Sequence, residues 1–126
     1  MKCFVEQNMR FIFVSRIRNL IHKRKMKAID NLIGKRVIIR AYGAGVFFGT
    51  LNEVENDTVE LVKARRLWYW DGAASLSQLA LEGTTAPGNC KFTVTVDSIV
   101  INKVIEIIPV TETAEKSIDS VKIWKR

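Results

Sequence analysis

Runs of β-branched and aromatic residues in the first half of the chain predict an antiparallel meander. Residues 36–40 (RVIIR) and 45–51 (GVFFGTL) are expected to form strands, because such side chains pack well on a pleated surface. Residues 41–44 join them as a turn, and the polar residues 55–58 form a second turn. Residues 58–62 alternate between apolar and polar side chains, as a half-buried strand does. Turns this short connect antiparallel neighbours, since parallel strands need long crossovers.

The next segment, residues 63–72 (KARRLWYWDG), has apolar residues on both of its predicted faces. A period of two places Trp68 and Trp70 on one face and Leu67 and Tyr69 on the other. A single small sheet with two apolar faces needs cover from a helix layer or from another copy of the chain. The pattern therefore predicts a homo-oligomer.

Glycine and proline positions then mark a helix and a loop. Residues 73–81 (AASLSQLAL) predict a short helix that ends at Gly83, and residues 84–89 predict a loop. Upstream of the meander, residues 28–34 predict a helical turn closed by Gly34, because glycine enters the left-handed cap without strain.

The end of the chain predicts two more strands and a helix. The strands are expected at residues 91–96 and 99–108, the second with a break near Asn102. Pro109 marks the change from strand to helix, and Thr111 is the expected N-cap of a helical tail. The fold class is therefore α+β: a small, mainly antiparallel sheet with a short central helix and terminal helices.

Charge divides the chain into a basic arm, residues 1–25, and a single α+β domain, residues 26–126. Through Lys27 there are eight Lys and Arg against one Glu, and the remainder holds twelve residues of each sign. A nucleic-acid footprint spread over the folded domain is not indicated. Three interpretations of this amphipathic arm stay open. It forms a surface helix or a frayed end, or it forms a helix that lies on an anionic membrane or nucleic acid. In the third, Met26 is the true start and the arm is an extension upstream of it.

The sparse cysteines and histidine argue against most catalytic centres. Cys3, Cys90 and His22 are the only residues of these two types, so one domain can assemble neither a zinc site nor a Ser-His-Asp or Cys-His system. No catalytic residue, metal or cofactor is predicted. Two unequally placed thiols favour a reducing, cytoplasmic setting, and no run approaches the roughly 20 apolar residues of a membrane span.

The arginines beside the tryptophans are the most informative candidates. Guanidinium groups of Arg65 and Arg66 can grip phosphate oxygens while aromatic faces stack on a base. Alternation places the two arginines on opposite faces, so at most one shares a pocket with a given tryptophan. The alternative interpretation is a core tryptophan flanked by solvated arginines, in which truncation of Trp68 or Trp70 lowers thermal stability.

Four further positions carry weaker signals. The turn at residues 42–45 could present backbone N–H groups to a phosphate beside Arg40, although a turn with positive φ needs no ligand. Asn89 and Asn102 could read a base edge or ribose, although turn chemistry accounts for Asn89. Phe92 is either a core residue or a stacking platform.

The run ARRLWYWDGAASLSQLALEG, preceded by GKRVIIRAYGAGVFFGTL and followed by INKVIEIIPVTETAEKSI, resembles the phage-encoded anti-Thoeris sponge proteins, the first Thoeris anti-defence family. The resemblance spans about Met26 to Ile118, and its central block is specific. The arm at residues 1–25 is not part of it, so a family role does not extend to the arm.

This resemblance implies a homo-oligomer, a dimer or hexamer, that binds cyclic ADP-ribose isomers made by bacterial TIR-domain proteins and keeps them from a defence effector. Some members also hold cyclic trinucleotides. It implies that one of the paired arginines contacts ribose or phosphate, that Phe92 stacks on adenine and that Asn102 hydrogen-bonds the ligand. Pattern and resemblance together give the ligand set Arg65, Arg66, Trp68, Trp70, Asn89, Phe92 and Asn102. The candidates for a trinucleotide site are Arg40, Ala41, Gly43 and Gly45.

Three hypotheses follow. The first is a signal sponge without catalytic activity in the cytoplasm of an infected bacterium. The second is a nucleic-acid or membrane-surface adaptor that acts through the basic arm. The third is a hydrolase of the same signal, against which the missing histidine and metal ligands already argue.

Overall fold

The computed structural model describes residues 27–126, so the basic arm predicted at residues 1–25 lies outside the described residues. The chain divides into two units after Asn31, of which the described part of the first is α2 (Lys27–Asp30). The second unit, residues 32–126, carries the sheet and the other helices. No helix between Lys27 and Arg126 is long and apolar enough to cross a membrane.

The second unit is built on a six-stranded antiparallel sheet with the strand order β4-β3-β2-β1-β6, in which β5 also pairs with β3. The expected meander and the α+β fold class are confirmed. The strands are β1 (Arg36–Ala41), β2 (Gly45–Glu55), β3 (Thr58–Tyr69), β4 (Lys91–Phe92), β5 (Val96–Ile101) and β6 (Val104–Pro109).

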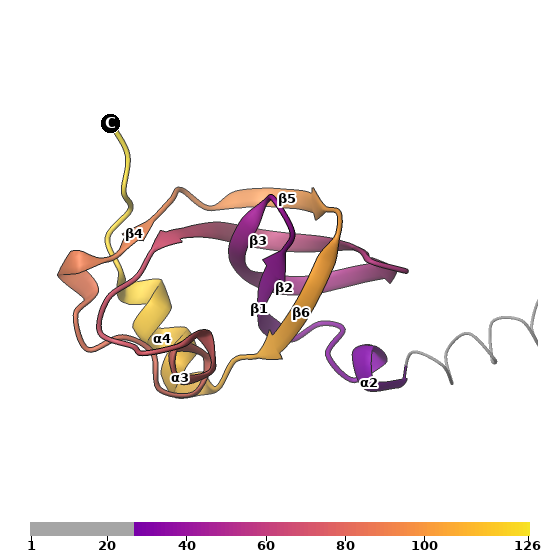
Figure 1. Ribbon diagram of the computed structural model, residues 1–126, viewed down its shortest axis with the longest axis horizontal. Coiled ribbons are helices and arrows are strands. Elements are labelled where there is room, and N and C mark those ends of the chain that lie inside the picture. The colour runs from indigo at the N-terminus through magenta and orange to yellow at the C-terminus, as the bar shows by residue number, and fades with distance from the viewer. Residues whose placement is uncertain (1–26) are drawn as a thin grey trace, which may run out of the picture. The chain divides into compact units, whose positions relative to one another are not determined.

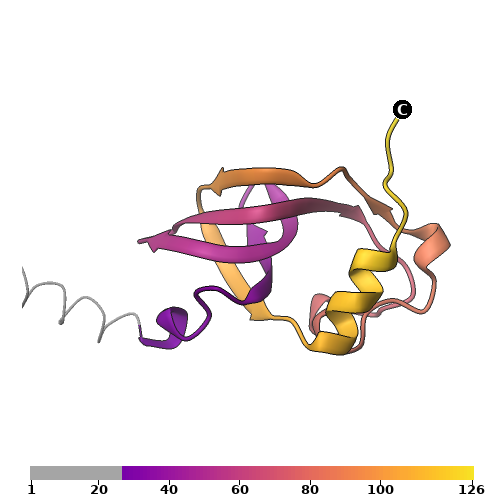
Figure 2. The same cartoon turned by 180° about the vertical axis from the view of Figure 1, so that it is seen from behind.

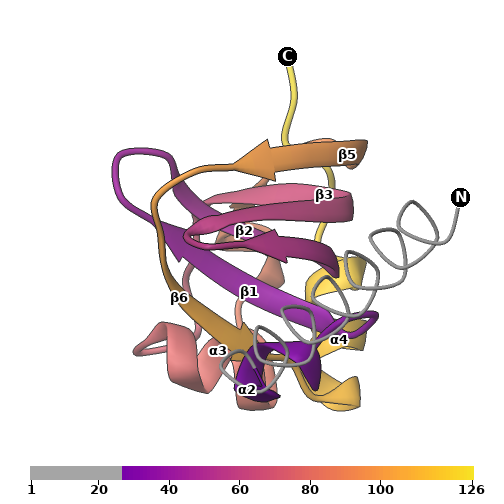
Figure 3. The ribbon, with the colours of Figure 1, turned by 90° about the vertical axis from the view of Figure 1, so that its right-hand side faces the viewer.

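β3 is long enough to pair with two strands along one edge of the curled sheet (Figure 3). Its first half pairs with β5, from Val59 opposite Ile101, and its last residues pair with β4. At the far side β6 pairs with β1, and β5 and β6 follow each other through the turn at residues 102 and 103, as expected (Figure 3). Buried cross-strand pairs such as Ile39–Phe47 fill the inside of the curl.

Two helices cover the other face of the sheet at one end. They are α3 (Leu76–Glu82) and α4 (Glu112–Ser120), which lie side by side (Figures 1 and 2). The chain passes from α3 through the 3₁₀ turn η1 (Pro87–Asn89) into β4. The core on this side combines apolar residues of both helices with sheet residues. Its fully buried side chains include Ile38, Phe48, Leu79, Phe92 and Ile118.

The helix ends follow the predicted chemistry. Thr111 caps α4, because its Oγ1 accepts the Ala114 N–H at 3.1 Å, and Gly83 closes α3 with φ 79°. Gly34 has φ 84°, which fits the expected turn after α2. The start of α3 was expected at residue 73 but lies at Leu76, because Ser75 Oγ accepts the Gln78 N–H and serves as the N-cap.

Three expected elements differ from the structure. Residues 63–72 are not a separate strand: β3 runs from Thr58 to Tyr69 through a bulge at Lys63, which has φ 51°. The strand expected at residues 91–96 ends at Phe92, and β5 starts at Val96. The tail is helical only to Ser120, after which Ile123 forms a parallel bridge with Phe92 of β4.

Candidate functional site

Arg66 lies on the same face of the sheet as Phe47, and its side chain is exposed to solvent. It lies on β3 opposite Phe47 of β2, and its guanidinium carbon is 4.8 Å from the centre of the Phe47 ring. The backbone of Arg66 is fixed by Thr93, which donates its N–H to the Arg66 carbonyl and accepts the Arg66 N–H on Oγ1, both at 3.0 Å. Among residues 27–126, Arg66 forms no ion pair. Its charge is therefore available to an anion.

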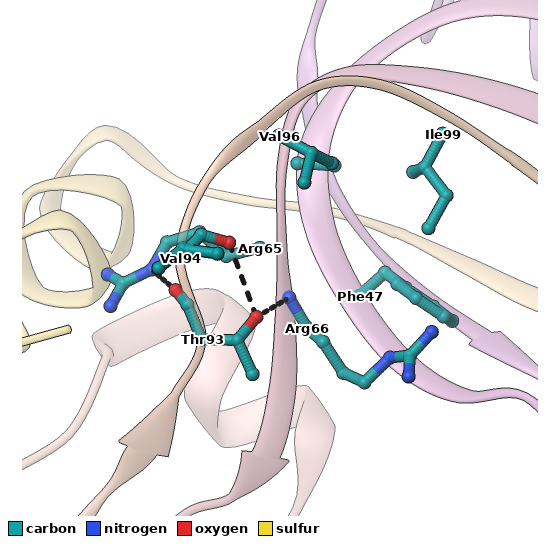
Figure 4. Close-up of a pocket in the computed structure, with 8 residues that line it drawn as sticks. Phe47, Arg65, Arg66, Thr93, Val94, Val96 and Ile99 are labelled. Carbon is teal, nitrogen blue, oxygen red and sulfur yellow. Dashed lines mark hydrogen bonds between the residues drawn. The ribbon is translucent and has the colours of Figure 1, made fainter. Parts of the chain in front are cut away.

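An open pocket of about 250 Å³ lies on one side of Arg66 (Figure 4). We call it the Thr93 pocket, because the segment between β4 and β5 forms one of its walls. Its surface is mostly apolar, and the Arg66 guanidinium is the exposed charge at its border. Its lining residues are Phe47, Ala64, Arg65, Arg66, Thr93, Val94, Val96 and Ile99.

A second pocket, of about 200 Å³, lies along the same strand, and Arg66 borders it too. We call it the Trp70 pocket. It joins the β1–β2 turn to the end of β3, so Gly45 of the predicted trinucleotide set meets Arg66, Trp68 and Trp70 of the predicted ligand set. The positive φ angles of Gly43 (78°) and Gly45 (103°) are those the turn itself requires. The other residues that line it are Ala44, Val46 and Leu67.

Arg65 points the opposite way, toward the helices, as Figure 4 shows. Its side chain is buried, and four of its five N–H donors are used by main-chain carbonyls. Burial lowers the pKa of the Arg65 guanidinium, and the negative charge of Asp119 offsets part of that effect. The structure therefore separates the two arginines that the sequence left as alternatives: Arg65 lines part of the Thr93 pocket but its guanidinium is held by the fold, whereas the Arg66 guanidinium is exposed at both pockets. The carbonyls belong to Phe92, Thr93, Ile118 and Val121.

Phe92 and the two asparagines do not join Arg66. Phe92 is fully buried in the helix-side core, so the prediction that its ring stacks on adenine is wrong for this structure. Asn102 accepts a hydrogen bond from Thr58 at the far end of β3, eight residues or about 26 Å from Arg66 along the strand. Asn89 donates to the Asp71 carboxylate at 3.2 Å. Hydrogen bonds within the fold thus account for both amides.

The rest of the predicted trinucleotide set is not gathered at a pocket. Arg40 pairs with Glu106 of β6 at 3.5 Å, and Ala41 is buried. Of the four residues in that set, only Gly45 borders either of the two pockets.

Trp68 of β3 and Trp70, which directly follows the strand, are less buried than the core interpretation predicts. Trp70 is half-buried and packs against the helix-side core, whereas Trp68 is 63% exposed. Trp68 stacks on Trp124 of the C-terminal segment, with ring centres 6.3 Å apart and planes 16° from parallel. Sequence reasoning missed Trp124. The β-branched residues Val121 and Ile123, separated by Lys122, were the signal for an extended segment.

The described part of the chain gathers no group of three or more His, Cys, Asp or Glu side chains that could hold a metal ion. The pocket borders therefore offer a guanidinium, indole rings and backbone groups. These groups bind anions and aromatic rings.

Residues 34–118, more than half of the chain, match the domain of unknown function DUF6948. The chain belongs to the DUF6948 family. The DUF6948 region contains Arg65, Arg66 and both pockets, and it ends before Trp124. No curated protein matches the sequence. The fold of this DUF6948 protein is similar to the crystal structure of a heptameric archaeal Sm protein, with TM-score 0.45 and 18% identity over 68% of this chain and 98% of that chain.

Proposed function

We propose that this DUF6948 protein captures a small nucleotide signal and holds it without chemical change. The observation that carries the proposal is Arg66, an exposed cation without an ion-pair partner among the described residues, between two pockets that have aromatic residues in their walls. A guanidinium grips phosphate oxygens with paired hydrogen bonds, and indole faces stack on purines. Neither pocket is bordered by a carboxylate, histidine or thiol that could act as a general acid, base or nucleophile.

The size of the pockets constrains how a nucleotide would lie. Each is smaller than the roughly 300 Å³ at the lower end of ligand pockets. A nucleotide would therefore span both, with its phosphate at the shared Arg66 and its base against the exposed ring of Trp68 in the Trp70 pocket. Phe47 is covered by the Arg66 side chain and positions the guanidinium rather than stacking on a base.

The resemblance to the anti-Thoeris sponge proteins supplies the finer identity: the signal is a cyclic ADP-ribose isomer, and the protein acts in the cytoplasm of an infected bacterium. Such a sponge works by mass action. It must bind its ligand more tightly than the effector does and release it slowly. Cyclic trinucleotides are the second class of ligand to be tested.

Substitution of Arg66 by alanine is expected to weaken capture about 10- to 100-fold, equivalent to about 1.5–3 kcal/mol for a lost charge-assisted contact. Calorimetric titration with cyclic ADP-ribose isomers and cyclic trinucleotides measures the effect. Lys116→Ala is the matched control, because it removes the same charge from an exposed position on α4. Heat release and chromatography of the ligand should recover it unchanged; a cleaved product would favour the hydrolase. Wild-type affinity in Arg66→Ala would remove Arg66 from the site.

We also propose that copies of the chain associate through the outer strands of the sheet. Within the described residues, β5 pairs only with β3 and β6 only with β1, so each has a backbone edge without a strand partner. Exposed apolar side chains lie on both strands: Val100 is 61% exposed and Ile105 57% exposed. Edges of this kind add strands from other chains unless charges blunt them.

The double substitution Val100→Lys and Ile105→Lys is therefore expected to convert the oligomer to a monomer. Size-exclusion chromatography with light scattering measures the mass against the 14.3 kDa of one chain. Leu81→Lys, at an equally exposed position on α3, should leave the mass unchanged. A wild-type protein that elutes as a monomer at high concentration contradicts the proposed association.

A further inference from the structure

Two indole rings form an exposed stack at the end of β3. Trp68 and Trp124 are 63% and 40% exposed, and the Lys91 ammonium lies 5.6 Å from the centre of the Trp124 ring. We call Trp68, Trp124 and Lys91 the stacking surface. Large aromatic rings left in water and aligned with each other are typical of a contact site. Trp68 also lines the Trp70 pocket, whereas Trp124 and Lys91 border neither that pocket nor the Thr93 pocket.

The C-terminal segment that carries Trp124 is held in place by the fold. Ile123 bridges Phe92 of β4, and the Trp124 N–H donates to the Phe92 carbonyl at 2.8 Å. Just upstream, the Val121 carbonyl accepts a hydrogen bond from buried Arg65. The backbone of Trp124 is thus anchored to β4, and its ring contacts Trp68 and the Lys91 ammonium.

The segments that carry these rings and Lys91 are basic, although the chain after Lys27 is neutral on balance. Residues 66–70, 91–92 and 122–126 contain five exposed Lys and Arg residues and no acidic side chain. The acids nearest in sequence are engaged elsewhere, Asp71 by Asn89 and Asp119 by Arg36. The five cations are Arg66, Lys91, Lys122, Lys125 and Arg126.

From this juxtaposition we infer that the stacking surface binds single-stranded nucleic acid. Bases of an unpaired strand present the flat faces that indoles stack on, and its phosphates pair with the surrounding cations. A duplex hides those faces. A second copy of the chain would bring five like charges against five, which opposes self-association through this surface. An anionic membrane would satisfy the cations but makes no use of stacked rings.

Tryptophan fluorescence gives a direct readout, because all three tryptophans of the chain, Trp68, Trp70 and Trp124, lie on or beside this surface. Titration of the full chain with a 15-nucleotide oligothymidylate should quench the emission, and the apparent affinity should fall with increasing salt. A strand of three nucleotides should bind more weakly than the 15-nucleotide strand, and so should a duplex of 15 base pairs. Binding through the basic arm alone would raise the anisotropy of a labelled strand without this quenching, since residues 1–25 contain no tryptophan.

Trp124→Ala is expected to weaken binding of the oligothymidylate about tenfold, the usual effect of losing one base stack. Lys91→Ala tests the surface without removing a ring. The matched control is Tyr42→Ala, because Tyr42 is also exposed and lies beside a lysine, Lys103 at 5.9 Å, on the β1–β2 turn. Capture of a cyclic nucleotide at Arg66 should be unchanged in Lys91→Ala, because Lys91 lines neither pocket and its ammonium lies beside the Trp124 ring, which separates this inference from the proposed function.

Three results would overturn the inference. They are oligothymidylate binding without tryptophan quenching, equal affinity in wild type, Trp124→Ala and Lys91→Ala, and quenching by phosphatidylserine vesicles with none by the oligonucleotide. The last would assign the surface to a membrane instead.

Discussion

Replacement of Arg65 by methionine is expected to destabilise the protein by about 3–5 kcal/mol, even though the substituted chain is similar in length and more apolar. The guanidinium donates to carbonyls of Phe92, Thr93, Ile118 and Val121 at 3.0–3.2 Å. Each buried acceptor left without a donor costs about 1–3 kcal/mol, and the ends of α4 and β4 cannot all reach water. The loss approaches the whole stability of a small domain, which is about 5–15 kcal/mol.

Urea denaturation followed by circular dichroism measures this effect, and Arg66→Met is the matched control. It makes the same substitution one residue along β3, at a side chain that forms no ion pair with another described residue, and should change stability by less than about 1 kcal/mol. Arg65→Lys should fall between them, because one ammonium lacks the planar fork that reaches four carbonyls. Equal midpoints for Arg65→Met and Arg66→Met would show that the buried guanidinium does not hold α4 and the C-terminal segment.

The second large effect is expected at Gly83, which ends α3 where it meets α4. Gly83 has φ 79° and ψ −155°, a region that side chains rarely enter, and a Cβ there would lie 2.3 Å from the Ser117 Cβ. Gly83→Ala therefore combines backbone strain with a clash between the two helices. We expect a loss of about 4 kcal/mol.

The melting temperature of Gly83→Ala should be compared with that of Gly88→Ala. Gly88 lies in η1 with no atom within 4 Å of the added Cβ and no positive φ, so its substitution should be nearly neutral. If the two variants melt together, the α3–α4 contact accommodates a methyl group and the geometry at Gly83 is not a constraint.

Local chemistry made the element boundaries predictable where the signal was a single residue type. Gly83, Thr111 and the break at residues 102 and 103 were each located from the sequence, because glycine, a capping hydroxyl and a two-residue polar turn act within a few residues. The bulge at Lys63 could not be located from the sequence, since lysine has no preference for positive φ. That bulge changes which residues of β3 face the inside of the curl, so it decides the side on which Arg66 lies.

That one arginine is buried and the other exposed could be predicted from the sequence only in part. Alternation separates Arg65 from Arg66, but which of them is buried depends on where the C-terminal end of α4 comes to lie, some fifty residues later. The same non-local packing buries Phe92 and brings Trp124 to Trp68. Contacts between distant segments have no local pattern, which is why the stacking surface was missed.

The pairing of the strands determines the order in which this fold can be completed during synthesis. The β1–β2–β3 hairpins are local, but β1 pairs with β6, which places Val37 opposite Pro109, and the carbonyls that satisfy Arg65 extend to Val121. Until those residues leave the ribosome, the nascent chain holds a cation that will be buried and two unpaired strand edges. High contact order of this kind slows folding. Residues 104–121 therefore complete the pairing of β1 and the burial of Arg65, and a ribosome that stalls before them would leave a nascent chain prone to aggregation.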